Sequence, residues 1–326
     1  MPKILIIPGI TTLPQVTQGQ LQRIREAAGA DTEIVVAEDR DDQLRHIADT
    51  DYLLGQVDRE LFANAKRLRW VQAISAGVDV MLFPEMVKSE VILTSEKGLV
   101  GEHLADHAFG LLLAIARQIH SAIREGPHSW QLQVRLAMRR TALELSDLTM
   151  GILGLGSTGV AVARRAAAFG MTVLAVDPEE VPQPPFVDEL AGMDRFDDLL
   201  ARSDVVAICC PLTPQTRGLF DLQTFRKMKP SAILVNVTRG AIVDEAALAQ
   251  ALQEGLIAAA GLDVTPQEPL PPESPLWRLD NVVITPHTAG ASQYRADRAI
   301  DRFCQNLPRI RRGEPLVGVI DKAKGY

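Results

Sequence analysis

The chain has 326 residues, of which 47% are hydrophobic and 23% charged, as expected for a globular protein with a sizeable core and about two domains. Its formal net charge is −7 and no basic stripe stands out, so nucleic acid is not an expected partner. Three cysteines make neither a disulfide framework nor a metal pattern, and the longest apolar segment, residues 108–116, is too short to span a bilayer.

Residues 1–98 alternate short apolar runs with polar segments of helical spacing. The apolar runs predict a small parallel sheet with strands at residues 3–7, 34–37, 52–54, 70–74 and 91–94. The first run starts at Lys3 without the apolar region and cleavage site of a signal peptide, so we expect a cytoplasmic protein. A helix is predicted over residues 16–28, ending before Gly29.

One long, mostly apolar helix is predicted from Leu99 to Ile119. It has few charges on any face, so we expect it to be buried all round or against a partner subunit. His103 and His107 are spaced i, i+4 on this helix, as in some zinc pairs. Without a third ligand nearby, we favour helix packing or interface hydrogen bonds. Residues 121–146 are more polar and contain Gly126-Pro127, which predicts a break and then an arginine-bearing helix or arm.

A glycine-rich turn, Gly-Leu-Gly-Ser-Thr-Gly, occupies residues 154–159. An apolar run precedes it, a helical pattern follows it, and a second apolar run comes next, at residues 171–176. In such a strand–turn–helix–strand unit, Gly154 permits the turn, Gly156 lets a pyrophosphate approach the backbone and Gly159 lets helix and strand pack closely. The helix N-terminus offers free N–H groups to the phosphates. Because this context is complete, we favour a dinucleotide site over an ordinary turn.

Asp177 ends the second apolar run, about 20 residues after Gly154, where a carboxylate that binds the adenosine ribose hydroxyls is expected. The same carboxylate would repel the 2′-phosphate of NADP. Pro178, Glu179 and Glu180 follow it, and no Arg or Lys is nearby to accept that phosphate. We therefore expect NAD rather than NADP.

The remaining chain again alternates strands and helices. Strands are predicted at residues 205–209, 232–237, 257–262 and 282–285, and helices at 197–201, 222–228, 245–253 and 292–312. The last helix has no sheet of its own after it, so we expect it to return to the first domain. The sequence thus predicts an α/β protein with two doubly wound parallel-sheet domains. A Rossmann dinucleotide-binding domain, residues 99–290, would be inserted in a flavodoxin-like substrate domain, residues 1–98 plus 291–326.

Polar residues follow successive strands of the second domain, at the sheet edge where ligands of open parallel sheets bind. They are Asp177, Cys210-Pro211, Thr238-Arg239, Asp263, Glu268 and His287. Taken alone, Arg239, Glu268 and His287 could each be an ordinary residue of the surface or of a loop, without a catalytic role. Together, they suit hydride transfer to a keto acid. Arg239 would bind the carboxylate and carbonyl, His287 would act as acid or base, and Glu268 would stabilise its imidazolium.

These residues lie within motifs that occur in a recognisable order along the chain. The motifs are GLGSTG (154–159), CPLTPQTRG (210–218), NVTRGAIVDE (236–245), GLDV (261–264), QEPLP (267–271) and TPHTAG (285–290). Over nearly its whole length the sequence resembles the D-isomer-specific 2-hydroxyacid dehydrogenases. The resemblance implies that Arg239 is the substrate arginine, Glu268 the supporting acid and His287 the acid/base.

The resemblance also implies a cofactor site, a substrate loop and a homodimer. Asp263 would hold the nicotinamide carboxamide. The implied site for NAD, or NADH in the reductive direction, comprises Gly154, Gly156, Ser157, Thr158, Gly159, Asp177, Cys210, Pro211, Thr216, Val237, Thr238, Asp263 and Gly290, with no metal. Ser75, Ala76 and Gly77 match the loop whose N–H groups hold the substrate carboxylate. Members of the family usually dimerise through the nucleotide domain, which agrees with the long apolar helix and the arm.

The expected activity is the NAD-dependent interconversion of a small 2-keto acid and its D-2-hydroxy acid. A glyoxylate or hydroxypyruvate reductase is the plainest candidate, and neither nucleic acid nor a membrane is an expected partner. Glu268 argues against the formate-oxidising branch of the family, which carries Gln there. The alternative is a co-repressor-like protein that senses NAD(H) without turnover. The intact set of Arg239, Glu268 and His287 weighs against it, because a sensor needs no acid–base pair.

Overall fold

The computed structural model describes all 326 residues, and the chain divides into two compact units. The first unit comprises Met1–Val100 and Ala291–Tyr326, and the second comprises Gly101–Gly290. Two segments far apart in the sequence therefore build one unit, because the last helix returns to the sheet formed by the N-terminal residues. No helix combines the length and apolar character needed to cross a bilayer.

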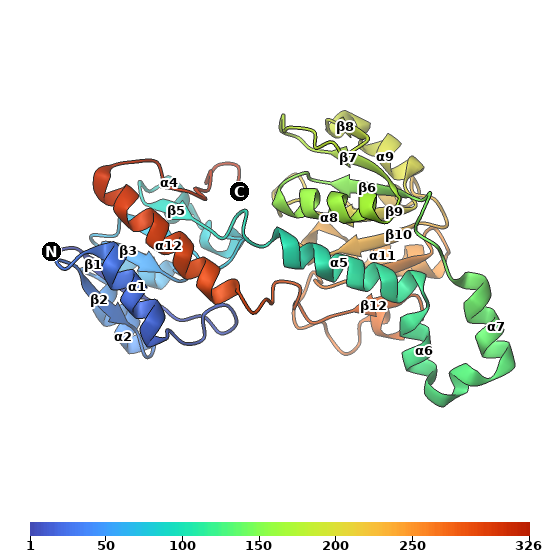
Figure 1. Cartoon of the computed structure of the whole chain (residues 1–326), viewed down its shortest axis with the longest axis horizontal. Helices are drawn as coiled ribbons and strands as arrows, with labels where there is room; N and C mark the ends of the chain where they lie inside the picture. The colour runs from blue at the N-terminus through green and yellow to red at the C-terminus, as the bar shows by residue number, and fades with distance from the viewer. The chain divides into compact units, whose positions relative to one another are not determined.

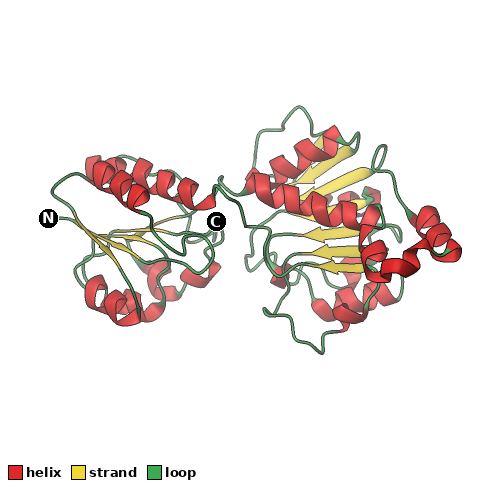
Figure 2. Ribbon diagram, turned by 60° about the horizontal axis from the view of Figure 1, so that its bottom comes forward, coloured by secondary structure: helices red, strands yellow, loops and turns green.

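The first unit is a five-stranded parallel sheet in the order β2-β1-β3-β4-β5, which is the strand order of a flavodoxin-like domain, the kind of domain that was predicted. The strands are β1 (Lys3–Ile6), β2 (Glu33–Val36), β3 (Tyr52–Leu54), β4 (Trp70–Gln72) and β5 (Ile92–Thr94). Its helices are α1 (Gln18–Ala28), α2 (Arg40–Ile47), α3 (Arg59–Asn64), α4 (Pro84–Lys88), α12 (Arg295–Arg312) and the 3₁₀ turn η1 (Asp79–Met81). Helices cover both faces of this sheet, as Figure 2 shows.

The returning helix α12 lies beside α1 in Figure 1 and is amphipathic. Its residues Ile300, Phe303 and Leu307, spaced three and four apart, are fully or almost fully buried. The Phe303 ring stacks on Trp70 of β4, with ring centroids 4.9 Å apart. The apolar spacing of α12 thus explains why this segment joins the first unit.

The second unit is a seven-stranded parallel sheet in the order β12-β11-β10-β9-β6-β7-β8. The strands are β6 (Thr149–Leu153), β7 (Thr172–Val176), β8 (Glu189–Ala191), β9 (Val205–Ile208), β10 (Ile233–Asn236), β11 (Ala259–Leu262) and β12 (Val282–Ile284). The chain moves outward from β6 to one edge and then from β9 to the other, which is the predicted Rossmann topology. The sequence did not predict β8, because this short edge strand buries none of its residues fully.

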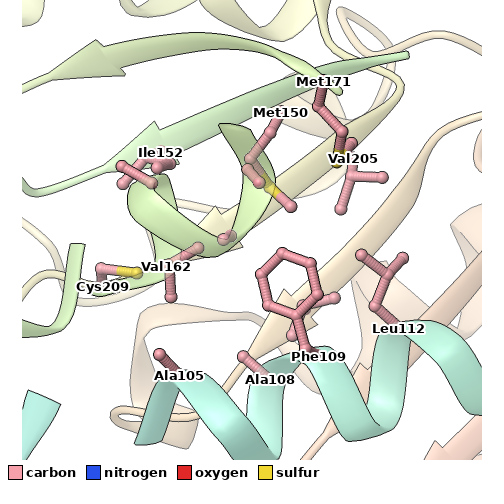
Figure 3. Packing of buried hydrophobic residues seen from close by; sticks show 14 of the residues in the cluster. Ala105, Ala108, Phe109, Leu112, Met150, Ile152, Val162, Met171, Val205 and Cys209 are labelled. Carbon is pink, nitrogen blue, oxygen red and sulfur yellow. The ribbon is translucent and has the colours of Figure 1, made fainter. Parts of the chain in front are cut away.

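Helices cover both faces of this sheet as well. They are α5 (Gly101–Ala116), α6 (Ile119–Glu125), α7 (Leu132–Thr141), α8 (Ser157–Ala168), α9 (Phe196–Arg202), α10 (Leu222–Phe225) and α11 (Glu245–Gln253), with short 3₁₀ turns η2 (Gly126–Trp130), η3 (Met193–Arg195), η4 (Gly240–Ile242) and η5 (Pro275–Arg278). The core between α5, α8 and the sheet is apolar, and Figure 3 shows Ala105, Ala108, Phe109 and Leu112 of α5 facing it.

The predicted single helix from Leu99 to Ile119 was wrong in its extent. Helix α5 ends at Ala116, and Gln118 adopts a left-handed backbone with φ of 58° before α6 begins. Of the two alternatives for its surroundings, burial all round within the single chain is wrong, and burial against a partner subunit stays a prediction. Glu102 and Asp106 are exposed, and they form ion pairs with Arg164 and Arg165 of α8.

The predicted arm is present as α6, η2 and α7, which extend from the rest of the second unit in Figure 1. The break falls at Gly126, whose φ is 52°. Four large apolar side chains of the arm are exposed: Ile119, Ile123, Trp130 and Leu132.

Candidate active site

The glycine-rich turn after β6 has the geometry that its sequence predicts. Gly154 has a φ of 92°, and a Cβ there would lie 2.9 Å from the backbone of Cys210. A Cβ on Gly159 would lie 2.0 Å from the carbonyl oxygen of Gly154, so close helix–strand packing requires glycine. A Cβ on Gly156 would meet no atom within 4 Å. The space beside Gly156 is thus open, as a bound pyrophosphate would require.

Asp177 is bound to this turn through its side chain. Its Oδ2 accepts a hydrogen bond from the Leu155 backbone N–H at 2.7 Å, and its Oδ1 accepts one from the Glu179 N–H at 2.9 Å. Helix α8 begins beside them, with Ser157 and Thr158 as its first residues. The carboxylate, the glycine turn and the helix N-terminus therefore lie together. This set fits a dinucleotide whose phosphates face the helix and whose ribose faces Asp177.

The predicted cofactor residues after β9 form a compact turn beside Gly154. Cys210 is buried, and its burial raises the pKa of the thiol to about 12, so the side chain stays neutral. The Thr216 hydroxyl donates to the carbonyl oxygen of Pro211 at 2.8 Å and closes the turn. Cys210 therefore serves as a small packing residue under the glycine turn.

A buried amide shapes the turn that carries Arg239. Asn236, at the end of β10, donates from Nδ2 to the Arg239 carbonyl oxygen at 3.0 Å and accepts the Thr238 N–H at Oδ1 at 3.1 Å. Thr238 is half-buried, Val237 is buried, and the Arg239 guanidinium donates to the Thr238 carbonyl oxygen at 2.8 Å. Sequence reasoning gave Asn236 no role of its own, although it is the first residue of the motif at 236–245.

Gly240 brings the Arg239 turn against the loop that follows β11. A Cβ on Gly240 would lie 1.9 Å from the carbonyl carbon of Thr265, a distance that no side chain permits. Thr265 in turn donates its backbone N–H to Glu268 Oε1 at 3.1 Å. The missing side chain of Gly240 therefore allows the segments carrying Arg239 and Glu268 to pack together.

His287 and Glu268 form a direct pair at the same sheet edge. His287 Nδ1 lies 2.6 Å from Glu268 Oε2, and both side chains are partly exposed. His287 has a left-handed backbone with φ of 53°. Because Nδ1 is bound to the carboxylate, Nε2 is the nitrogen available to a substrate. Arg239, Asp263 and His287 follow the adjacent strands β10, β11 and β12, so the tertiary structure brings the predicted residues to one edge.

Asp263 has a structural task that the sequence did not predict. Its carboxylate is fully buried and accepts hydrogen bonds from the Thr285 hydroxyl at 2.6 Å and from the backbone N–H groups of Thr288 and Ala289 at 2.9 and 2.8 Å. Burial alone would raise the pKa of this carboxyl, but these hydrogen bonds and one from His107 lower it below its usual value. The ionised Asp263 carboxylate thus holds, through these hydrogen bonds, the segment that carries His287 and leads to Gly290.

The predicted substrate loop lies in the first unit, after β4. The Ser75 hydroxyl donates to the Gly77 carbonyl oxygen at 2.8 Å, and the Ser75 carbonyl oxygen accepts the Glu96 N–H at 3.0 Å. The backbone N–H groups of Ala76 and Gly77 donate to no group of the chain. They are therefore available to an anionic ligand.

Comparison with known proteins agrees with this geometry. Residues 109–289 match the family model of the D-isomer specific 2-hydroxyacid dehydrogenase, NAD binding domain. A glyoxylate reductase of Korarchaeum cryptofilum is 40% identical over 267 residues, which is 80% of this chain and 79% of that protein.

Two solved structures share the whole architecture. The NADPH-dependent glyoxylate/hydroxypyruvate reductase of Sinorhizobium meliloti, in complex with NADP and sulfate, has a TM-score of 0.82 and 27% identity, with all of each chain covered. The NAD-dependent formate dehydrogenase of Staphylococcus aureus, in complex with NAD, has a TM-score of 0.75 and 26% identity over 98% of each chain. The chain therefore belongs to the D-isomer specific 2-hydroxyacid dehydrogenase family and is an NAD(P)-dependent 2-hydroxyacid dehydrogenase.

Proposed function

We propose that this dehydrogenase reduces a small 2-keto acid of the glyoxylate or hydroxypyruvate type to its D-2-hydroxy acid, with His287 as the acid. The observation that carries the proposal is the 2.6 Å pair between His287 Nδ1 and Glu268 Oε2, beside the Arg239 turn. The glyoxylate reductases among its relatives support this substrate class. Formate oxidation is not favoured, because Glu268 carries a charge that suits an imidazolium.

Each residue of the set has a defined task in this reaction. When bound, the reduced nicotinamide supplies the hydride to the carbonyl carbon. Arg239 holds the substrate carboxylate with its planar guanidinium and polarises the carbonyl. His287 donates the proton from Nε2 to the carbonyl oxygen, while Glu268 accepts from Nδ1–H and stabilises the imidazolium before transfer. Acid–base help of this kind contributes about 10²–10⁴-fold in rate.

We propose that NADH is preferred over NADPH. The preference is supported by Asp177, whose carboxylate would accept the ribose hydroxyls and repel a 2′-phosphate. The cofactor would lie along the residues assigned to it above, from the glycine turn through Cys210, Pro211 and Thr216 to Val237, Thr238 and Gly290. Asp263 already accepts hydrogen bonds at both carboxylate oxygens, so its first task would be to hold the segment beside the nicotinamide.

The first unit is proposed as the substrate domain. Its loop Ser75–Gly77 would bind the substrate carboxylate through the N–H groups of Ala76 and Gly77, which have no acceptor within the chain. The second unit is proposed as the NAD-binding domain, which the family model matching residues 109–289 supports.

A homodimer through the second unit is also proposed. It is supported by the exposed apolar residues of the arm, of which Ile123 and Trp130 are 77% and 79% exposed. Burial against a second copy would remove this apolar surface from water. The cytoplasmic location expected from the sequence stays a prediction.

The test is a panel of 2-keto acids assayed with NADH and NADPH in parallel. Turnover of glyoxylate or hydroxypyruvate with NADH is the expected result. Quenching of NADH fluorescence without turnover on any keto acid would overturn the proposed reaction. That result would correspond to the NAD(H)-sensing alternative, which the relatives do not support, since they are named for reductases and dehydrogenases.

A further inference from the structure

The segment that carries His287 is wrapped around Asp263. The Asp263 carbonyl oxygen accepts the His287 N–H at 2.8 Å, and its carboxylate accepts from Thr285, Thr288 and Ala289. His287 is held between them with its left-handed backbone. Such a conformation in a residue other than glycine costs roughly 1 kcal/mol or more, and it persists only where the surroundings enforce it.

One side chain from outside this segment, His107 of α5, also contacts Thr285 and Asp263. His107 Nε2 lies 2.8 Å from the Thr285 hydroxyl oxygen and 3.3 Å from Asp263 Oδ1. The Thr285 hydroxyl donates its hydrogen to the Asp263 carboxylate, because an ionised carboxylate can only accept. The His107 Nε2 atom must therefore carry a hydrogen, which it donates to Thr285 at 2.8 Å and shares with the more distant Asp263 Oδ1 at 3.3 Å. His107, Thr285 and Asp263 thus form a directed chain of hydrogen bonds.

The backbone of β11 allows the helix to reach this chain. Gly261 lies two residues before Asp263, and a Cβ there would lie 2.9 Å from Leu111 Cβ. Leu111 follows His107 by one helical turn, so both side chains lie on the same face of α5. The glycine in β11 lets α5 approach the sheet closely at the point where His107 meets Thr285.

We propose that His107 is a positioning residue for the reaction: through Thr285 and Asp263 it holds the segment 285–289 so that His287 presents Nε2 to the substrate. The inference rests on the proposed role of His287 as the acid. The burial of Asp263, with no exposed side-chain surface, gives this chain of hydrogen bonds its strength, because no water competes for the carboxylate. No hydrogen bond or ion pair joins His107 to Glu268 or His287.

The test compares two substitutions of His107 in the full-length enzyme. His107→Leu removes the donor. His107→Gln keeps an N–H donor at a similar distance from the helix. Misplacement of a catalytic group by about 1 Å costs roughly 10²-fold in rate. We therefore expect His107→Leu to lower kcat by about 10- to 100-fold with little change in KM or in NADH affinity, and His107→Gln to restore most of kcat.

Two further variants separate positioning from general damage to the helix. Asp106→Asn changes the neighbouring residue of α5, which is exposed and faces α8, and it should leave kcat unchanged. Thr285→Val removes the hydroxyl that accepts from His107 and donates to Asp263. The kcat of the double variant His107→Leu/Thr285→Val should then be no lower than that of the slower single variant, because both substitutions interrupt the same chain of hydrogen bonds.

Three results would overturn the inference: wild-type kcat in His107→Leu, an equal loss in His107→Gln, or losses that multiply in the double variant. His287→Ala is assayed alongside. If His287→Ala lowers kcat strongly while His107→Leu keeps the wild-type kcat, only the positioning role fails. If His287→Ala retains turnover, the proposed acid itself is wrong.

Discussion

His287 Nδ1 lies 2.6 Å from Glu268 Oε2, and this contact joins the end of one strand to the loop after its neighbour. The carboxylate determines which ring nitrogen remains for the substrate. It also provides the charge that a protonated imidazole needs before it gives up its proton. The geometry therefore makes separate predictions for the two partners.

His287→Ala is expected to lower kcat by about 10²–10⁴-fold in the reductive direction, because the carbonyl oxygen loses its proton donor. NADH affinity should change little, since the side chain bonds to Glu268 and not to the glycine turn. Steady-state assays with glyoxylate and titration of NADH fluorescence measure the two quantities. Full turnover in this variant would exclude His287 as the acid.

Glu268→Gln keeps the shape of the side chain but removes its charge. Hydrogen bonds to charged groups contribute roughly 1.5–3 kcal/mol, so we expect a loss of about 10- to 100-fold in kcat. The Thr265 N–H can still donate to the amide oxygen, so the loop should remain folded. Equal turnover of the variant and the wild type across pH 5 to 9 would show that the charge has no part in catalysis.

Asp177→Ala is expected to reduce the preference for NADH. The substitution removes the carboxylate that would bind the ribose and repel a 2′-phosphate, and it also removes the hydrogen bond to Leu155. The ratio of kcat/KM for NADH to that for NADPH should therefore fall, chiefly because the NADH value falls. A wild-type enzyme that already prefers NADPH would contradict the assignment.

Gly240→Ala tests the packing of the Arg239 turn against the Thr265 loop. Backbone atoms lie 1.9 to 2.5 Å from the position of the new Cβ, so one of the two segments must move. Overpacking of this kind costs typically about 1–3 kcal/mol, and the free energy of unfolding should fall by that order. Turnover should fall as well, while Gly110→Ala in α5, where no atom lies within 4 Å of the new Cβ and the backbone is helical, serves as the control.

Asp263→Asn tests the buried carboxylate through the pH dependence of stability. The pKa of Asp263 is lower in the folded protein than its usual value of 3.8, so its contribution is present above that pH and is lost as the pH falls below it. The variant should be less stable by about 1–3 kcal/mol at pH 7, because the amide cannot accept all the hydrogen bonds of the carboxylate. Urea unfolding at pH 7 and pH 3 should show the difference shrinking on the acid side. A constant difference would contradict a lowered pKa.

The sequence alone predicted the fold class and named the residues of the candidate site. The alternation of apolar runs and helical spacing predicted both sheets, because strand and helix periods are local properties of the chain. The turn at Gly154 was predicted for the same reason, since its conformation depends on neighbouring residues. His287, Glu268 and Arg239 could be placed at one edge, because parallel strands end together.

The tertiary structure alone decided how those residues are held. His107 and Thr285 are 178 positions apart, and only the packing of α5 on β11, which Gly261 permits, brings them together. The clash that makes Gly240 necessary likewise involves another loop, which no local pattern reports. The continuous apolar pattern over residues 99–119 predicts one continuous helix. In the structure α5 ends at Ala116, and the left-handed backbone of Gln118 separates it from α6. Periodicity identifies which face of an element is buried, but the packing of distant segments determines what that face touches.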